Sequence, residues 1–180
     1  MKLNAAFPVL PLLALIAPPL LAMADMPLGT SQAGQSRYAG AAARTVRAMI
    51  EYTRWPTPRD PVVLCVAGAA EHAGGLGGLR LTDGRRVERR IVSAAPGALG
   101  GCDVVYLGSM PIAQQRQLTA AVRGRGVLTI AEDDPGNASE AMFVLTYQPA
   151  ALSFRLNVDA VSRSGLKVDP RVLRVAQGGL

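Results

Sequence analysis

The sequence predicts one three-layer α/β domain with a mixed, largely parallel sheet and a C-terminal antiparallel hairpin. Apolar runs at residues 62–67, 103–107 and 126–131 are bounded by turn residues, which is typical of parallel strands buried on both faces. Helical patterns alternate with these runs, as in βα units. Two more apolar runs, 143–147 and 152–156, are separated by a short loop and predict the hairpin.

Residues 1–24 have the pattern of a signal peptide. A positive start precedes a mostly apolar run, and the run closes on an Ala-Met-Ala sequence that predicts cleavage near Ala24 and export of the protein. An uncleaved membrane anchor is the alternative, but the run is short for a spanning helix and carries several prolines. We interpret residues 25–36 as a flexible lead and residues 37–180 as the domain.

The first element of the domain is expected to be a helix. Apolar residues recur at helical spacing, and Pro56 disfavours helical angles in the residue before it, so Trp55 is expected at the helix exit. After the first buried strand, the alanine- and glycine-rich residues 69–79 predict a second, short helix.

A polar strand and an amphipathic helix are expected next. Residues 85–92 follow an Asp-Gly turn and predict the strand, and residues 112–122 predict the helix. Residues 132–137, which begin with three acidic residues, follow the third buried strand. Their spacing fits no calcium-binding loop, so we expect a solvated loop there.

The C-terminal region predicts two short capped helices. Asn157 is expected to cap a helix at 158–164, with Gly165 beyond its end and Val158 packed on the sheet. Asp169 is expected to cap a last short helix that begins with proline.

The chain is basic, with a formal net charge of +6 at pH 7. Its arginines are scattered and few aromatic residues lie among them, which argues against nucleic acid as a partner. A positive surface is compatible with an acidic protein partner or a membrane surface.

Cys65 and Cys102 are the two cysteines of the chain. An even number of cysteines in an exported protein favours a disulfide, and two free buried thiols are the alternative. A bridge that closes a loop of this length would stabilise the fold by roughly 4 kcal/mol in the chain-entropy model.

The residues offer little catalytic chemistry. A nucleophile–histidine arrangement would have to use His72, the one histidine, which we expect to face solvent on the helix predicted at 69–79. One histidine and two paired cysteines do not make an ordinary zinc site, and the glycines of 69–79 lack the order that cradles phosphates. The sequence therefore predicts no catalytic residue, metal or cofactor, and a hydrolase using His72 is the weakest alternative.

Five segments occur in an order and spacing that resemble one family. Each is weak alone, but with the signal peptide and both cysteines they make the chain similar to the YfiR family of periplasmic proteins, over nearly the whole predicted domain. The segments are 52–56 (Tyr-Thr-Arg-Trp-Pro), 64–66 (Leu-Cys-Val), 101–102 (Gly-Cys), 128–132 (Leu-Thr-Ile-Ala-Glu) and 154–173.

The resemblance implies a repressor without enzymatic activity. Such proteins bind the periplasmic sensor domain of an inner-membrane diguanylate cyclase and hold it inactive, which lowers cyclic-di-GMP and biofilm formation. The resemblance also implies a homodimer and, as a second partner, an OmpA-like outer-membrane lipoprotein that sequesters the repressor. Cys65 and Cys102 match family positions that form a disulfide, whereas the positions of a second family cysteine pair hold Asn137 and Val144 here.

Two surfaces are candidates for contact with the cyclase. Tyr52, Arg54 and Trp55 combine residue types that are enriched in binding hot spots, and a core position for Trp55 is an equal alternative. Asp159 and Arg163 form the second candidate surface. The alternative function is a periplasmic small-ligand sensor, which would use a pocket at the sheet edge.

Overall fold

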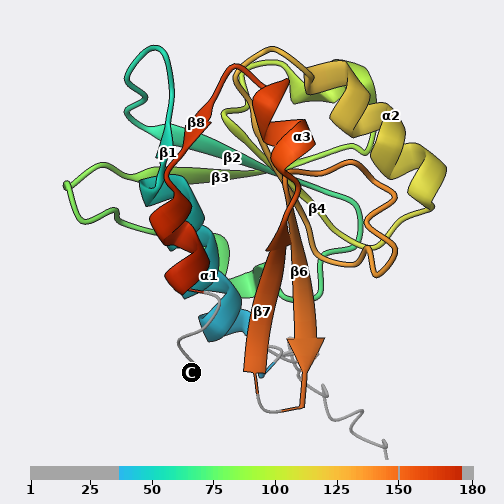
Figure 1. The fold of residues 1–180 in the computed structure, drawn as a ribbon, viewed down its shortest axis with the longest axis horizontal. Coiled ribbons are helices and arrows are strands. Elements are labelled where there is room, and N and C mark those ends of the chain that lie inside the picture. The colour runs from blue at the N-terminus through green and yellow to red at the C-terminus, as the bar shows by residue number, and fades with distance from the viewer. Residues whose placement is uncertain (1–36, 150, 176–180) are drawn as a thin grey trace, which may run out of the picture. The chain divides into compact units, whose positions relative to one another are not determined.

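The computed structural model describes residues 37–149 and 151–175 (Figure 1). The chain divides into two compact units, Met1–Gln32 and Ala33–Leu180, and the described residues belong to the second. The predicted signal peptide and the N-terminal lead both lie outside the described residues.

A six-stranded mixed sheet has the strand order β3-β2-β4-β5-β6-β7. Every neighbouring pair is parallel except β6 and β7, which form an antiparallel hairpin. The predicted α/β fold with a largely parallel sheet and a C-terminal hairpin is therefore confirmed. The strands are β2 (Val62–Ala67), β3 (Val87–Val92), β4 (Val104–Leu107), β5 (Leu128–Ala131), β6 (Phe143–Gln148) and β7 (Ala151–Leu156).

Helices cover both faces of this sheet. α1 (Ala39–Glu51) contributes to the larger of two apolar clusters, and α2 (Ile112–Val122) contributes to the other. Figure 1 shows the two helices on opposite sides of the sheet. The remaining helices are α3 (Val158–Ser162) and the short 3-10 helices η1 (Ala73–Leu76), η2 (Pro96–Leu99) and η3 (Pro170–Arg174).

β2 supplies side chains to both clusters. Val62, Leu64 and Val66 belong to the larger cluster, whereas Cys65 and Ala67 belong to the second. Because successive side chains of a strand point to opposite faces, burial on both faces requires an almost continuous apolar sequence. The three-layer arrangement predicted from the apolar runs follows from this alternation.

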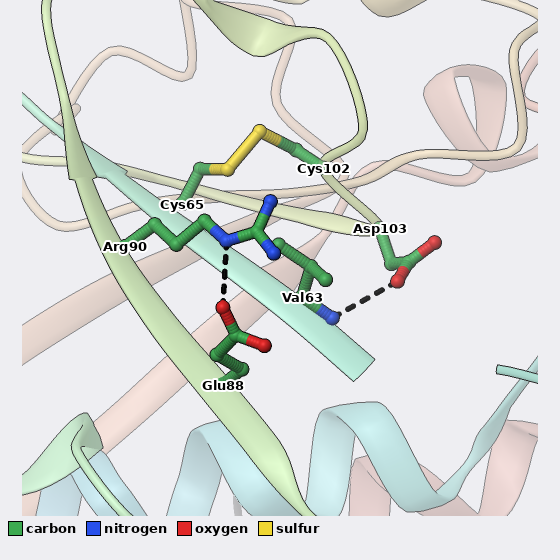
Figure 2. The surroundings of a disulfide bond; sticks show 6 residues. All are labelled: Val63, Cys65, Glu88, Arg90, Cys102 and Asp103. Atoms are coloured by element: carbon green, nitrogen blue, oxygen red, sulfur yellow. Dashed lines mark hydrogen bonds and ion pairs between the residues drawn. A yellow bond between two sulfur atoms is a disulfide. The ribbon is translucent and has the colours of Figure 1, made fainter. Parts of the chain in front are cut away.

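β3 forms one edge of the sheet and is mostly exposed. Ile91 is 79% exposed, and Glu88 pairs with Arg90 at 2.8 Å on the strand surface (Figure 2). Charged side chains on an edge strand discourage pairing with another chain. The polar strand predicted at 85–92 is confirmed.

The prediction of a helix at 69–79 is wrong. Only η1 is helical there, as a single 3-10 turn. Glycines lower helix stability, and this segment holds several. Gly75 is needed for packing, because a Cβ there would lie 2.7 Å from the carbonyl oxygen of Ala39 in α1.

The exit of the first helix also differs from the prediction. α1 ends at Glu51, before Trp55, and the chain enters the short strand β1 (Thr53–Arg54). This strand pairs antiparallel with β8 (Lys167–Val168) in a separate two-stranded sheet. The pairing joins segments far apart in the sequence, so the local helical pattern could not indicate it.

The predicted C-terminal caps are confirmed. The Asn157 side chain accepts a hydrogen bond from the Ala160 amide (3.0 Å) at the start of α3, and Gly165 has a φ of 79°. Asp169 accepts a hydrogen bond from the amide of the second residue of η3. The prediction that Val158 packs on the sheet is wrong, since this residue is 69% exposed, whereas Ala160 and Val161 of α3 pack against the larger apolar cluster.

The acidic loop after β5 is not solvated throughout, contrary to the prediction. Glu132 and Asp134 are buried, and Asp133 is exposed. The loop folds around the Asp134 carboxylate, which accepts hydrogen bonds from the amides of Ala138 and Ser139, both at 2.8 Å. These amide donors take the place of the water molecules that the carboxylate would bind if it were exposed.

Cys65 of β2 and Cys102, just before β4, form the predicted disulfide (Figure 2). The following residue, Asp103, is almost fully buried. Its carboxylate accepts a hydrogen bond from the Val63 amide (2.9 Å) and lies 3.0 Å from the Arg59 guanidinium. The bridge and this carboxylate both connect β2 to the start of β4.

We expect the disulfide to carry a large share of the stability. The double variant Cys65→Ala/Cys102→Ala should lose roughly 4 kcal/mol in the free energy of unfolding, because the unfolded chain is no longer closed into a loop. Urea unfolding of both proteins measures the difference. The control is the same comparison with dithiothreitol, in which the difference should mostly disappear; an equal loss in both buffers would contradict the expectation.

We expect Asp103 also to contribute substantially to the free energy of unfolding. Asp103→Ala is expected to lower the free energy of unfolding by roughly 2 kcal/mol, because the part-buried Val63 amide loses its acceptor and Arg59 loses its carboxylate partner. Asp103→Asn retains an acceptor oxygen and should cost less. Asp133→Ala, which removes an exposed carboxylate, is the matched control and should change stability by less than about 0.5 kcal/mol. Equal effects of the two alanine variants in urea unfolding would refute this role.

Candidate functional site

The two-stranded β1–β8 sheet carries the first candidate surface. The chain leaves α1 at Glu51 and turns at Tyr52 into β1. Thr53 points inward, is buried and donates its hydroxyl to the Met49 carbonyl (2.7 Å). Because neighbouring residues of a strand face opposite sides, Arg54 is exposed.

The C-terminal segment completes this surface. The Asp169 amide donates to the Tyr52 carbonyl (2.9 Å), and the Arg171 guanidinium lies 5.8 Å from the centre of the Tyr52 ring. Arg171 also pairs with the Asp169 carboxylate at 2.6 Å. We name Tyr52, Arg54, Trp55, Asp169 and Arg171 the β1–β8 surface.

The charges of the β1–β8 surface interact. The side-chain hydrogen bond from Arg171 is the main reason that the pKa of Asp169 is lowered to about 2, and the positive charge of Arg54 contributes. No ion pair of Arg54 is found within the described residues. Two arginines against one carboxylate leave the surface positive.

Trp55 lies between the core and solvent. Its half-buried ring packs against the larger apolar cluster, and its indole Nε1 is buried without a hydrogen-bond partner in the described part of the chain. Trp55 also borders a cavity of about 360 Å³, whose charged lining residues are Glu51, Arg54, Arg59 and Arg85. The residue therefore contributes to the core and to the surface beside β1.

Asp159 lies on α3, and Arg163 directly follows this helix. Both are exposed, and no ion pair joins their side chains in the described residues. Arg163 lines a small pocket beside α2 with Arg123 and Glu140. The second candidate pair, Asp159 and Arg163, includes no aromatic side chain.

A larger cavity of about 500 Å³ lies beyond the carboxyl ends of the central strands. We name it the carboxyl-end pocket. It is lined by residues 69–72 after β2, by Ser109 after β4, by Glu132 and Asp133 after β5, and by Tyr147 of β6.

Glu132 is the buried acid of this pocket. Its carboxylate accepts hydrogen bonds from the backbone amides of Glu71 (3.1 Å) and His72 (2.5 Å). Burial raises the pKa of Glu132, and these hydrogen bonds offset part of that rise. The prediction of a solvent-facing His72 is wrong: the residue is only 8% exposed, because the segment after β2 folds onto Glu132 instead of forming a helix.

Aromatic rings form one wall of the pocket. The Tyr147 ring centre lies 4.0 Å from that of His72 and 5.1 Å from that of Tyr38. The Tyr147 and Tyr106 hydroxyl oxygens are 3.3 Å apart. Burial raises the pKa of both tyrosines, so their hydroxyls stay protonated.

Sequence reasoning missed Glu132 and Tyr147 as pocket residues. The position of Glu132 could have indicated its role, because it directly follows a buried strand. The carboxyl ends of parallel strands meet at one edge of the sheet, where ligands bind. Tyr147 enters the pocket from the hairpin, and its position depends on the sheet order, which no local pattern reveals.

The YfiR/HmsC-like family model matches residues 40–177. The chain belongs to the YfiR/HmsC-like family. This family is periplasmic, regulatory and non-enzymatic, and it connects the protein to a diguanylate cyclase regulatory system. The match runs from α1 through η3 and so includes the disulfide, the β1–β8 surface and every lining residue of the carboxyl-end pocket named above.

Two further observations bear on this YfiR/HmsC-like protein. Within residues 37–149 and 151–175, no helix has both the length and the apolar character that a bilayer crossing requires. In the same residues, no group of three or more histidine, cysteine, aspartate or glutamate side chains is arranged to hold a metal ion.

The charge arrangement of the β1–β8 surface predicts a titration. Arg171→Ala should raise the pKa of Asp169 from about 2 towards the ordinary range, because the main hydrogen-bond donor is lost. A lowered carboxyl pKa adds stability that is present above the unfolded pKa and is lost as the pH falls through the folded one, so the variant should lose this contribution.

Carbon-detected NMR of the Asp169 carboxyl measures the pKa. Arg54→Ala is the matched control and should raise the pKa less, because Arg54 acts only through its charge. An unchanged Asp169 pKa in Arg171→Ala would show that the pair does not form in solution.

Proposed function

We propose that this protein is a periplasmic repressor that binds the sensor domain of an inner-membrane diguanylate cyclase and holds it inactive. Its action lowers cyclic-di-GMP and biofilm formation. The observation that carries the proposal is the family match over residues 40–177. The same resemblance supports a homodimer and an OmpA-like outer-membrane lipoprotein as the partner that relieves repression.

The β1–β8 surface is the proposed contact with the sensor domain. It presents a tyrosine, a tryptophan and two arginines, which are residue types enriched in hot spots. The excess of positive charge favours an acidic segment of the sensor domain.

Inhibition by binding needs no chemistry from the repressor. The β1–β8 sheet joins the end of α1 to the C-terminal segment, and Tyr52, Trp55 and Val168 pack against the larger apolar cluster. A binding surface that is ordered before association lowers the entropic cost of binding. The repressor then acts by selecting one conformation of the cyclase sensor domain.

Charge reversal should locate the contact. Arg54→Glu is expected to weaken binding to the purified sensor domain by at least about tenfold, because it removes a hot-spot residue and adds repulsion to an acidic partner. Isothermal titration calorimetry measures the affinity. In cells that express the cyclase, the same variant should fail to restore low cyclic-di-GMP in a strain lacking the gene.

Two matched controls complete the experiment. Arg116→Glu changes an exposed arginine of α2 and should leave the affinity within about twofold. Arg163→Glu tests the second candidate surface and should also have little effect. A loss with Arg163→Glu but not with Arg54→Glu would move the contact to α3. Unchanged cyclic-di-GMP on deletion of the gene, with the cyclase present, would refute the repressor function.

A further inference from the structure

The direction in which successive strands are added to the sheet reverses at β2. From β2 the chain goes outward to the edge strand β3 and then returns to β4 on the other side of β2. In open α/β sheets, a crevice forms outside the carboxyl ends of the strands at such a reversal, and ligands bind there. The carboxyl-end pocket occupies this position.

The floor of the pocket is built by two loops in direct contact. Ala69 and Ser109 exchange backbone hydrogen bonds of 2.8 and 3.3 Å. A Cβ on Gly108 would lie 2.6 Å from the Ala69 carbonyl, so only glycine allows this approach. The contact fixes the separation of the loops without any ligand, and the cavity of about 500 Å³ has the size of a small-molecule site.

The polar lining of the pocket is acidic in a basic protein. Of the residues that the structure describes, Glu71, Glu132 and Asp133 line it and no arginine or lysine does, although the chain has a net charge of +6. No arginine or lysine in the described residues pairs with Glu132. The pocket therefore favours a positively charged ligand.

The aromatic wall indicates an organic cation. Tyr147 and His72 line the cavity, and an aromatic ring attracts an ammonium group while it also packs against its carbon chain. A metal ion fits less well, because the described residues provide no group of three or more metal-ligating side chains. Burial raises the pKa of Glu132, and its hydrogen bonds and its interaction with His72 offset part of that rise.

We propose that the carboxyl-end pocket binds a small alkylammonium compound, with its cationic group near Glu71 and Asp133 and its chain against Tyr147. The site is independent of the proposed repressor function, since it rests on the sheet reversal and the pocket lining alone. It adds a small-molecule input to a protein whose proposed output is protein binding.

Three probes of equal length test the charge preference: cadaverine, pentane-1,5-diol and glutarate. Amide NMR titration of the purified protein should show saturable shifts at residues 70, 109 and 133 with cadaverine, with a Kd of about 1 mM at low salt. The neutral diol and the anionic glutarate should produce no saturable shifts. No cyclase is needed, so failure of this test and failure of the repressor function are distinguishable.

Paired variants test the location. Glu71→Gln/Asp133→Asn removes two exposed pocket carboxylates and should weaken cadaverine binding at least about fivefold. Asp83→Asn/Glu88→Gln removes two exposed carboxylates outside the pocket and should leave the affinity unchanged. Because all four side chains are exposed, both variants should fold.

Several results would overturn the proposal. They are the absence of saturable binding up to about 20 mM cadaverine, equal binding of the diol or glutarate, and equal losses in the two paired variants. Displacement of cadaverine by Ca²⁺ with shifts at the same amides would instead identify a cation site of another class and would also refute an alkylammonium site.

Discussion

Strands β2, β4 and β5 are covered on both faces, and this burial is the constraint on which the rest of the structure depends. Side chains of β2 alternate between the two apolar clusters, with Leu64 in one and Cys65 in the other. Such strands are mostly apolar along their length, and the polar exceptions Tyr106 and Thr129 have hydrogen-bond partners. The buried carboxylates lie at the strand ends, where the backbone leaves the sheet and its amides need new partners.

Buried carboxylates supply those partners. Asp103 accepts a hydrogen bond from Val63 at the amino end of the sheet, and Glu132 accepts two from the segment after β2 at the carboxyl end. Asp134 organises the loop that follows. Asp103 and Glu132 each join segments that are distant in the sequence, and an unpaired buried amide would cost more than the hydrogen bond stabilises. The walls of the carboxyl-end pocket are thus a direct consequence of how the strand ends are satisfied.

The sequence predicted what depends on local pattern and missed what depends on contacts between distant segments. Continuous apolar runs identified β2, β4 and β5, and cysteine parity identified the pair Cys65–Cys102. The pairing of β1 with β8 was missed because its two strands are separated by more than one hundred residues and are only two residues long. Glu132 was taken for a solvated residue because acidity normally indicates exposure; its burial depends on amides contributed by a loop about sixty residues away.

The disulfide has a consequence for local opening of the fold. It joins β2 to the start of β4, and these strands are neighbours in the sheet. The segment between the two cysteines includes the exposed edge strand β3 and residues 69–72 of the pocket wall. When this segment unfolds locally, the disulfide keeps β2 beside β4. The amides of the segment, including those of the pocket wall, can therefore exchange with solvent more readily than the amides of the central strands.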